Sequence, residues 1–148
     1  MPTANKIPDV KDDYQAFLAS LDLYLIALTQ SSFKIEREDY FKATEDNSIS
    51  FKLSSKPKDV EKNRFDVLST LNLKVSNDKS KKVFIVFAAT FELHFHASST
   101  NEEFIKRFCD SEIRLVVWPY FCEYVSDVTA RMYVPPLLLP LSEHNKKA

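Results

Sequence analysis

Two histidines separated by one residue, His94 and His96, are the first candidates for chemistry in this chain. They alternate with apolar residues, so on a strand both would lie on one face and could chelate a metal ion. A third ligand would have to come from His144 or a distant carboxylate, and no spacing points to one. The pattern favours solvated histidines on the outward face of a strand, and we predict no metal site.

The two cysteines, Cys109 and Cys122, are the second candidates. They lie 13 positions apart, without a Cys-x-x-Cys spacing or the order of cysteine and histidine that a nucleophile needs. We therefore interpret both as small buried side chains. Two cysteines make no disulfide framework, which favours a reducing cytoplasm.

Three carboxylates, Glu112, Glu123 and Asp127, share one arc of a predicted helix and could act as a general acid and base. No pocket is indicated around them, so a solvated helix face explains them better. Arg131 lies on the same arc, and its spacing allows an ion pair with Asp127 or Glu123. We predict no catalytic residues.

The chain contains no glycine, which excludes the glycine-rich phosphate loops and the Gly-x-Ser-x-Gly nucleophile elbow. No cofactor is predicted, and the chain is not expected to be an enzyme. The net charge of −1 gives no electrostatic case for nucleic acid. No apolar run approaches the ~18 residues of a membrane span, and no signal segment is apparent.

The length of 148 residues and the hydrophobic content of 45% predict one globular domain over residues 1–148. Residues 1–10 are expected to be disordered, and residues 142–148 to form a flexible tail.

The periodicity of the apolar residues predicts the elements that carry these side chains. A helix is expected near 12–19, and alternation of period two predicts strands. The predicted strands are 21–37, 48–53, 64–76 and 82–97. Loops are expected at 38–47 and, because of Pro57, at 54–62, with a turn at 77–80. Four strands before the longest helix indicate an α+β fold with a four-stranded antiparallel sheet, a short N-terminal helix and C-terminal helices.

In the first strand, the odd positions from Leu21 to Ala27, with Phe33 and Ile35, are predicted to face the core. Tyr24, Ile26 and Leu28 would then lie on the outer face. Their apolar character suggests that this half of the strand is covered on both sides.

Two helices are predicted after the sheet. The first spans 101–108 and begins with a Ser or Thr followed by Glu, like a capping box. Asp110 or Ser111 would cap the second, which should kink or restart at Pro119 and end before Pro135.

The second helix is apolar on more than half of its circumference, so it needs a sheet on one side and another copy of the chain on the other. The tail 135–141 is Pro- and Leu-rich. It could be a polyproline ligand for another protein, but packing over its own sheet is favoured because exposed leucines lose the free energy of burial.

This closing region resembles the SecB family of export chaperones and SecB-like relatives. The residues that carry the resemblance are Trp118-Pro119-Tyr120-Phe121, Glu123-Tyr124-Val125, Ala130-Arg131-Met132, Pro135-Pro136-Leu137 and Leu139. The order of four strands followed by helices agrees, as does the Ser31-Ser32-Phe33-Lys34 stretch of the first strand. The resemblance implies a cytoplasmic, ATP-independent holdase. It would be a homotetramer, built as a dimer of dimers, that binds unfolded polypeptides in hydrophobic grooves.

The chain departs from the family pattern at Tyr133, where a glycine is usual, and at Cys122, where an arginine is common. Export members carry an acidic sheet face for the SecA motor. This chain instead has lysines around its strands, at positions 52, 74, 79, 81 and 82. The resemblance implies SecA as a partner, and these lysines weaken that implication. A guarded antitoxin is the client of some SecB-like relatives.

We expect two sets of site residues. Those of the client-binding groove are Phe33, Tyr40, Phe41, Phe51, Phe65, Tyr133, Leu137 and Leu139. Those of the oligomer interface are Tyr24, Ile26, Trp118, Phe121, Tyr124, Val125, Val128 and Met132. The alternative is a small-ligand-binding or enzymatic α+β domain with a pocket between sheet and helix.

Overall fold

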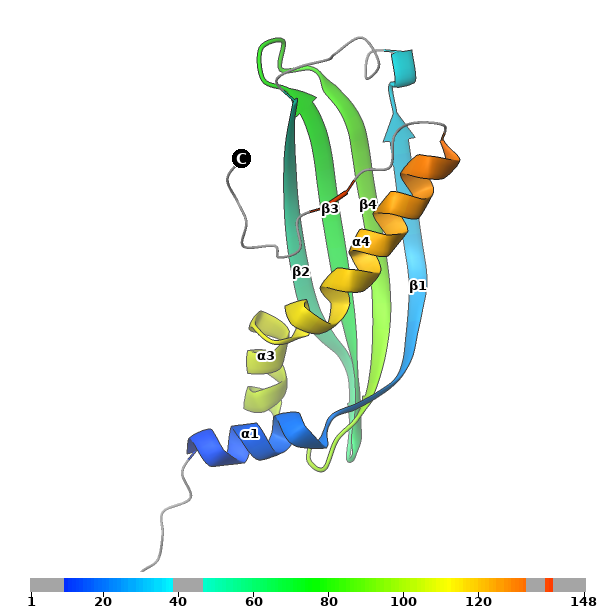
Figure 1. Cartoon of the computed structure of the whole chain (residues 1–148). Helices are drawn as coiled ribbons and strands as arrows, with labels where there is room; N and C mark the ends of the chain where they lie inside the picture. The colour runs from blue at the N-terminus through cyan, green and yellow to red at the C-terminus, as the bar shows by residue number, and fades with distance from the viewer. Residues whose placement is uncertain (1–9, 39–46, 133–137, 140–148) are drawn as a thin grey trace, which may run out of the picture.

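The computed structural model describes residues 10–38, 47–132 and 138–139 and contains one antiparallel sheet. Its strands are β1 (Asp22–Ile35), β2 (Asn47–Glu61), β3 (Arg64–Asn77) and β4 (Val83–His96), in the order β1-β4-β3-β2. The helices are α1 (Val10–Ser20), α3 (Glu102–Asp110) and α4 (Ile113–Arg131). Figure 1 shows α4 crossing one face of the sheet, with α1 and α3 near one of its ends. The predicted α+β fold is confirmed.

The two central strands follow the predicted alternation. Along β3, Val67, Leu71 and Leu73 are buried and face α4, while Asn72 and Lys74 between them are exposed. β4 repeats the pattern, with Phe87 and Leu93 among its buried residues. Strands with one face on the core alternate in this way because successive side chains point to opposite faces.

The predicted faces of β1 are wrong between its two register shifts, from Leu25 to Leu28. Register shifts lie between Leu23 and Leu25 and between Leu28 and Gln30. Each extra residue turns the following side chains to the other face. Leu25 therefore pairs with His94 on the outer face and is 48% exposed, whereas Ile26 pairs with the buried Leu93.

β2 is longer than predicted, because it continues through the expected loop at 54–62 and ends at Glu61. Pro57 is tolerated because β2 is an edge strand. No neighbouring strand lies on the open side of β2, so the N–H that proline lacks is not needed for a hydrogen bond there. A register shift between Pro57 and Val60 adjusts the pairing with β3. The loop predicted at 38–47 is also corrected at its start, where Glu38 is helical.

The predicted turn between β3 and β4 forms without glycine. The side-chain oxygen of Asn77 accepts hydrogen bonds from the backbone N–H groups of Lys79 at 3.0 Å and Ser80 at 2.9 Å. Lys81 takes a φ of 59°, in the left-handed region that glycine usually occupies. Asn77 thus replaces, by side-chain bonding, what glycine would supply by conformational freedom.

The helix caps differ from the predicted ones. Asn101, and not a Ser or Thr, caps α3 by accepting bonds from the N–H groups of Glu103 and Phe104. The residue before α4 is Glu112, which makes no capping bond with its side chain. Helix α4 also continues across Pro119 without a fresh start.

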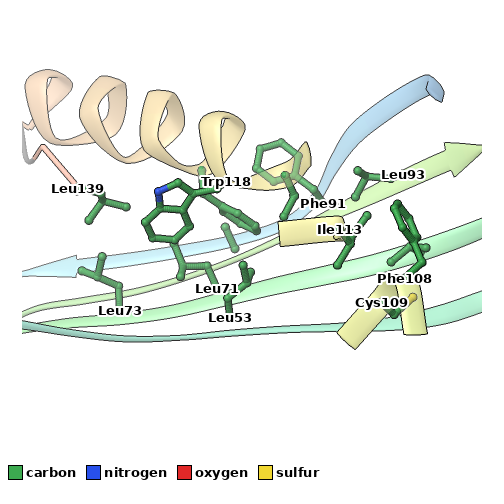
Figure 2. Close-up of a cluster of buried hydrophobic side chains, with 14 of the residues drawn as sticks. Leu53, Leu71, Leu73, Phe91, Leu93, Phe108, Cys109, Ile113, Trp118 and Leu139 are labelled. Carbon is green, nitrogen blue, oxygen red and sulfur yellow. The ribbon is translucent and has the colours of Figure 1, made fainter. Parts of the chain in front are cut away.

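The core lies between α4 and the sheet. Figure 2 shows Trp118 of α4 over Leu53 and Leu71 of the sheet, and Ile113 nearer to Leu93 and Phe108. Leu139 is buried in the same cluster, which confirms packing for that part of the tail, while Leu138 is 76% exposed. Val10, within the segment expected to be disordered, is the first residue of α1. The rest of the predicted disordered end, residues 1–9, and the predicted flexible tail 142–148 lie outside the described residues.

Candidate polypeptide-binding site

Helix α4 is buried on one side only. Val117, Phe121 and Val125 face the sheet and are fully buried, because they recur at the helical spacing that meets the central strands. On the other side Leu115 is 79% exposed and Tyr120 is 39% exposed. The helix therefore has apolar surface left over after its own sheet is covered.

A groove of about 550 Å³ runs beside α4. Its aromatic wall consists of Phe91 from β4 with Tyr120 and Tyr124 from α4, whose rings lie 6.3 and 6.1 Å from that of Phe91. Ser126 and Ala130 add small side chains, and the carboxylates of Glu123 and Asp127 complete the lining. We call this the α4 groove.

Polar contacts fix the walls of the α4 groove. The hydroxyls of Ser31 and Tyr124 lie 2.6 Å apart, which ties α4 to β1. The guanidinium of Arg131 donates to Asp127 at 3.1 Å, which confirms the predicted ion pair. This pair is exposed, so its contribution to stability is small. Aromatic surface beside carboxylates suits a ligand with apolar and basic groups.

Strand β1 is an edge of the sheet and lies on the same side of the molecule as the α4 groove. Tyr24, Leu25 and Leu28 on this strand are all exposed. An edge strand offers unpaired N–H and C=O groups to an added strand. Apolar side chains along such an edge favour pairing with another polypeptide.

Three predicted groove residues, Phe33, Phe51 and Leu139, pack near α4, but none of them lines the α4 groove. Phe33, Phe87, Leu73 and Phe51 form one row across the sheet through their strand pairing. Its two ends, Phe33 on β1 and Phe51 on β2, are half-buried, and Phe51 packs on Trp118 at 5.1 Å. Leu139 lies near Leu73 in Figure 2.

Other predicted groove residues do not join this row. Phe65 is fully buried under α1 at the far end of the sheet, so in this structure it offers no groove surface. The helix α1 covers Phe65 in this conformation, so a place for Phe65 in a client groove stays a prediction. Tyr40, Phe41, Tyr133 and Leu137 lie outside the described residues.

The predicted interface residues also divide. Trp118, Phe121 and Val125 are buried within the protomer, so they cannot contact a partner in this conformation. The reason is that the sheet takes this side of α4, and Leu115 occupies the other. The remaining predicted interface residues keep exposed or partly exposed surface: Tyr24, Ile26, Tyr124, Val128 and Met132.

Sequence reasoning assigned no site role to Leu115, Tyr120 or Phe91. All three were available in the apolar pattern, but periodicity gave no sign of which arc would meet the sheet. For Leu115, the proline four residues later, Pro119, is a usable signal. The carbonyl four residues before a proline has no helical N–H partner, which favours a solvent-facing position.

His94 lies on the outer face of the sheet, as predicted, but it is half-buried among charged groups. Its Nδ1 lies 3.0 Å from Asp66 Oδ1, and its Nε2 lies 3.2 Å from Glu92 Oε1. The Lys58 ammonium donates to the same Glu92 oxygen at 3.2 Å. Asp66 is buried, and its Oδ1 has no other donor in the described part of the chain.

Asp66, Glu92 and His94 bring three ligand atoms within 4.8 Å of one another, so a metal ion could in principle be held. Each imidazole nitrogen, however, already faces a carboxylate, and Lys58 adds a positive charge. The contacts of His94 with these carboxylates, together with the ion pair between Lys58 and Glu92, account for the cluster. His96 instead stacks on Tyr24 at 4.2 Å, and His144 lies outside the described residues.

The other candidates for chemistry are separated in space or inactive. Burial raises the pKa of Cys109 to about 12, and burial also raises that of Cys122, so neither thiol is an activated nucleophile. Glu112 contacts α1, whereas Glu123 and Asp127 line the α4 groove. Trp118 and Phe121 fill the space between sheet and helix where the alternative reading placed a pocket.

Residues 20–143 match the family described as preprotein translocase subunit SecB. The chain belongs to the SecB family. No curated protein matches it by sequence. No helix among the described residues is both long and apolar enough to cross a membrane.

One solved structure shows the same fold. The SecB-like chaperone of Mycobacterium tuberculosis, solved with a ChAD peptide from the HigA1 antitoxin, has a TM-score of 0.66 and 20% identity. That match covers 87% of this chain and 96% of the mycobacterial one. A Streptococcus agalactiae protein of unknown function is more distant, with a TM-score of 0.42 and 9% identity over 82% of this chain and 97% of that one. SecB is a chaperone family, which supports a chaperone role for this chain.

Proposed function

We propose that this chain is a cytoplasmic, ATP-independent holdase that binds unfolded polypeptide segments in the α4 groove. The observation that carries the proposal is the exposed aromatic wall of Tyr120 and Tyr124 over Phe91, beside an apolar edge strand. Aromatic side chains give large contact areas at small entropic cost, which suits a site that must accept many sequences.

The lining of the α4 groove defines the preferred segment. Glu123 favours a nearby basic residue, whereas Asp127 is already paired with Arg131. The aromatic wall favours apolar or aromatic residues. An extended segment could also pair its backbone with the open edge of β1. Such a site would not select a folded protein, because both contacts need an extended or locally unfolded chain.

The exposed surface of α4 supports an oligomer. Leu115 is the most exposed of the large apolar side chains described, and a second copy packed on α4 would remove it from water. Tyr24 and Ile26 on β1 are proposed as further interface residues. We propose a dimer of dimers, in which several grooves on one particle slow the release of a long client.

The mycobacterial neighbour binds an antitoxin peptide, and an antitoxin is one candidate client for this chain too. Hand-off to SecA is not part of the proposal. Lys52 and Lys74 lie exposed on the outer face of the sheet, where the family resemblance would require carboxylates.

The holdase proposal is tested by measuring whether this chain suppresses the aggregation of a thermally unfolded test protein. The chain should suppress light scattering, and Tyr120→Ala should weaken that effect severalfold. Val83→Ala is the matched control, because Val83 lies outside the groove and has the same 39% exposure as Tyr120. Absence of suppression at a severalfold excess, or an equal loss in both variants, would contradict the proposal. A monomer in size-exclusion chromatography with light scattering would contradict the proposed oligomer.

A further inference from the structure

Four phenylalanines from three elements gather at the end of the sheet away from the α4 groove. They are Phe65 of β3, Phe95 of β4, and Phe104 and Phe108 of α3, and we call them the phenylalanine cluster. The ring centroids of Phe65 and Phe95 are 5.2 Å apart, and those of Phe95 and Phe108 are 5.3 Å apart. Left uncovered, such a cluster would be an aromatic patch of the kind that marks binding sites.

The chain's own helix α1 covers this cluster with two side chains, Tyr14 and Phe17, which are both buried. The ring of Phe17 lies 6.1 Å from Phe65 and 5.7 Å from Phe104. Tyr14 meets Phe104 edge-on at 5.5 Å. Their spacing of i and i+3 puts both rings on one helix face. Asp13, Gln15 and Ala16 on the other faces are exposed.

The site also recognises the tyrosine hydroxyl. Tyr14 donates to Glu112 Oε2 at 2.5 Å, and the Arg107 guanidinium lies 4.0 Å from the centre of the Tyr14 ring. Burial alone would raise the pKa of the Glu112 carboxyl, but bonds from Ser111 and Tyr14 lower it overall. The site therefore combines an aromatic floor, a carboxylate acceptor and a cation over a ring.

The attachment of α1 is of a kind that another segment could replace. α1 has 11 residues, which is shorter than the ~12–15 residues that a helix needs to be stable alone, so its order depends on docking. Its release would break no strand pairing, because the sheet consists of β1 to β4 only. At its C-terminal end, Ser20 accepts a bond from the Ser98 N–H at 3.1 Å, which α1 would give up on leaving.

We propose that the phenylalanine cluster, with Glu112 and Arg107, is a second polypeptide-binding site. Its ligand is a helical segment with a tyrosine and, three residues later, a second aromatic residue. In the free protein α1 fills the site, and a client segment with this pattern displaces it. That the natural ligand is a client rests on the proposed holdase function. The exchange of α1 for another segment does not depend on that function.

A labelled peptide with the sequence of residues 10–21 tests the exchange by fluorescence anisotropy on the full chain. The wild type should bind it weakly, because the tethered α1 competes at a high effective concentration. Phe17→Ala weakens that competitor, so the peptide should bind at least about tenfold tighter. Gln15→Ala, on the exposed face of α1, is the matched control and should behave as the wild type.

The outcomes separate the alternatives. If Phe17→Ala keeps the circular dichroism of the sheet but binds the peptide no tighter than Gln15→Ala, the site is overturned. If Phe17→Ala does not fold, Tyr14→Phe replaces it. That variant keeps the ring and loses the bond to Glu112, so a smaller gain in peptide affinity is expected, and no gain overturns the site. If the oligomer shrinks with Phe17→Ala, α1 docks on a neighbouring copy, which overturns occupancy within one chain.

Competition connects the site to clients. An unfolded test protein rich in aromatic residues should displace the labelled peptide from the Phe17→Ala chain. Failure to displace it would contradict the proposal that clients are the ligands of this site. The holdase proposal fails separately, in the aggregation assay. Peptide binding without suppression of aggregation would support the second binding site and contradict the holdase proposal.

Discussion

Replacing Phe121 by alanine distinguishes a core position from an interface position on α4. Phe121 is fully buried in the protomer, and its ring meets Phe91 edge-on at 4.9 Å. Truncating such a phenylalanine costs about 3–5 kcal/mol, because the transfer free energy is lost and a cavity remains. For a chain of 148 residues this corresponds to a fall in Tm of roughly 6–20 °C.

Leu115→Ala is the paired variant on the opposite side of the same helix. Because Leu115 is 79% exposed, its truncation should change the stability of the protomer by no more than about 0.5 kcal/mol. If a second copy covers this position, the oligomer should dissociate at a higher protein concentration than the wild type. The predicted contrast is therefore loss of folding stability in one variant and loss of assembly in the other.

Denaturant unfolding followed by circular dichroism, with light scattering to measure mass, provides the assay. Both variants should be measured over a range of protein concentrations, since the apparent stability of an oligomer depends on concentration. The assignment of faces would be refuted if Phe121→Ala lost assembly while its protomer stayed as stable as the wild type. It would also be refuted if Leu115→Ala lost as much folding stability as Phe121→Ala.

Three further predictions concern titratable groups and the backbone. The pKa of Glu112 is lowered in the folded state, so its stabilising contribution is present above the ordinary carboxyl pKa and lost as the pH falls through the lowered value. The protection of the α1 amides, measured relative to the intrinsic exchange rate at each pH, should thus fall on acidification. Glu112→Gln should abolish that fall, and an unchanged fall in the variant would contradict the prediction. Cys109 should react with iodoacetamide more slowly than Cys122 in the folded chain, as followed by mass spectrometry, because it is the more buried thiol and burial raises its pKa to about 12. Lys81→Gly should stabilise the chain by up to about 1 kcal/mol in denaturant unfolding, because the φ of 59° strains any residue with a Cβ; a loss of stability would show that no strain is held there.

The local patterns of this sequence were sufficient for the fold class. Alternation at Val67, Leu71 and Leu73 predicted β3 and the face that it buries, because a strand with one covered face must repeat every two residues. Asn77 and its polar neighbours predicted the turn, because a side-chain oxygen can bond the backbone locally. The closing motif around Trp118 predicted the family that the match over residues 20–143 confirms.

What lies far apart in the chain could only be settled by the tertiary structure. Pro57 could be read as a strand residue only once β2 was known to be an edge. The faces of β1 depend on two register shifts against β4, which leave no trace in its apolar spacing. Three-dimensional packing likewise decided the candidate site. α4 is apolar on more than half of its circumference, so periodicity could not decide whether Phe121 or Leu115 would meet the sheet. The burial of Phe65 required α1 to fold back over it.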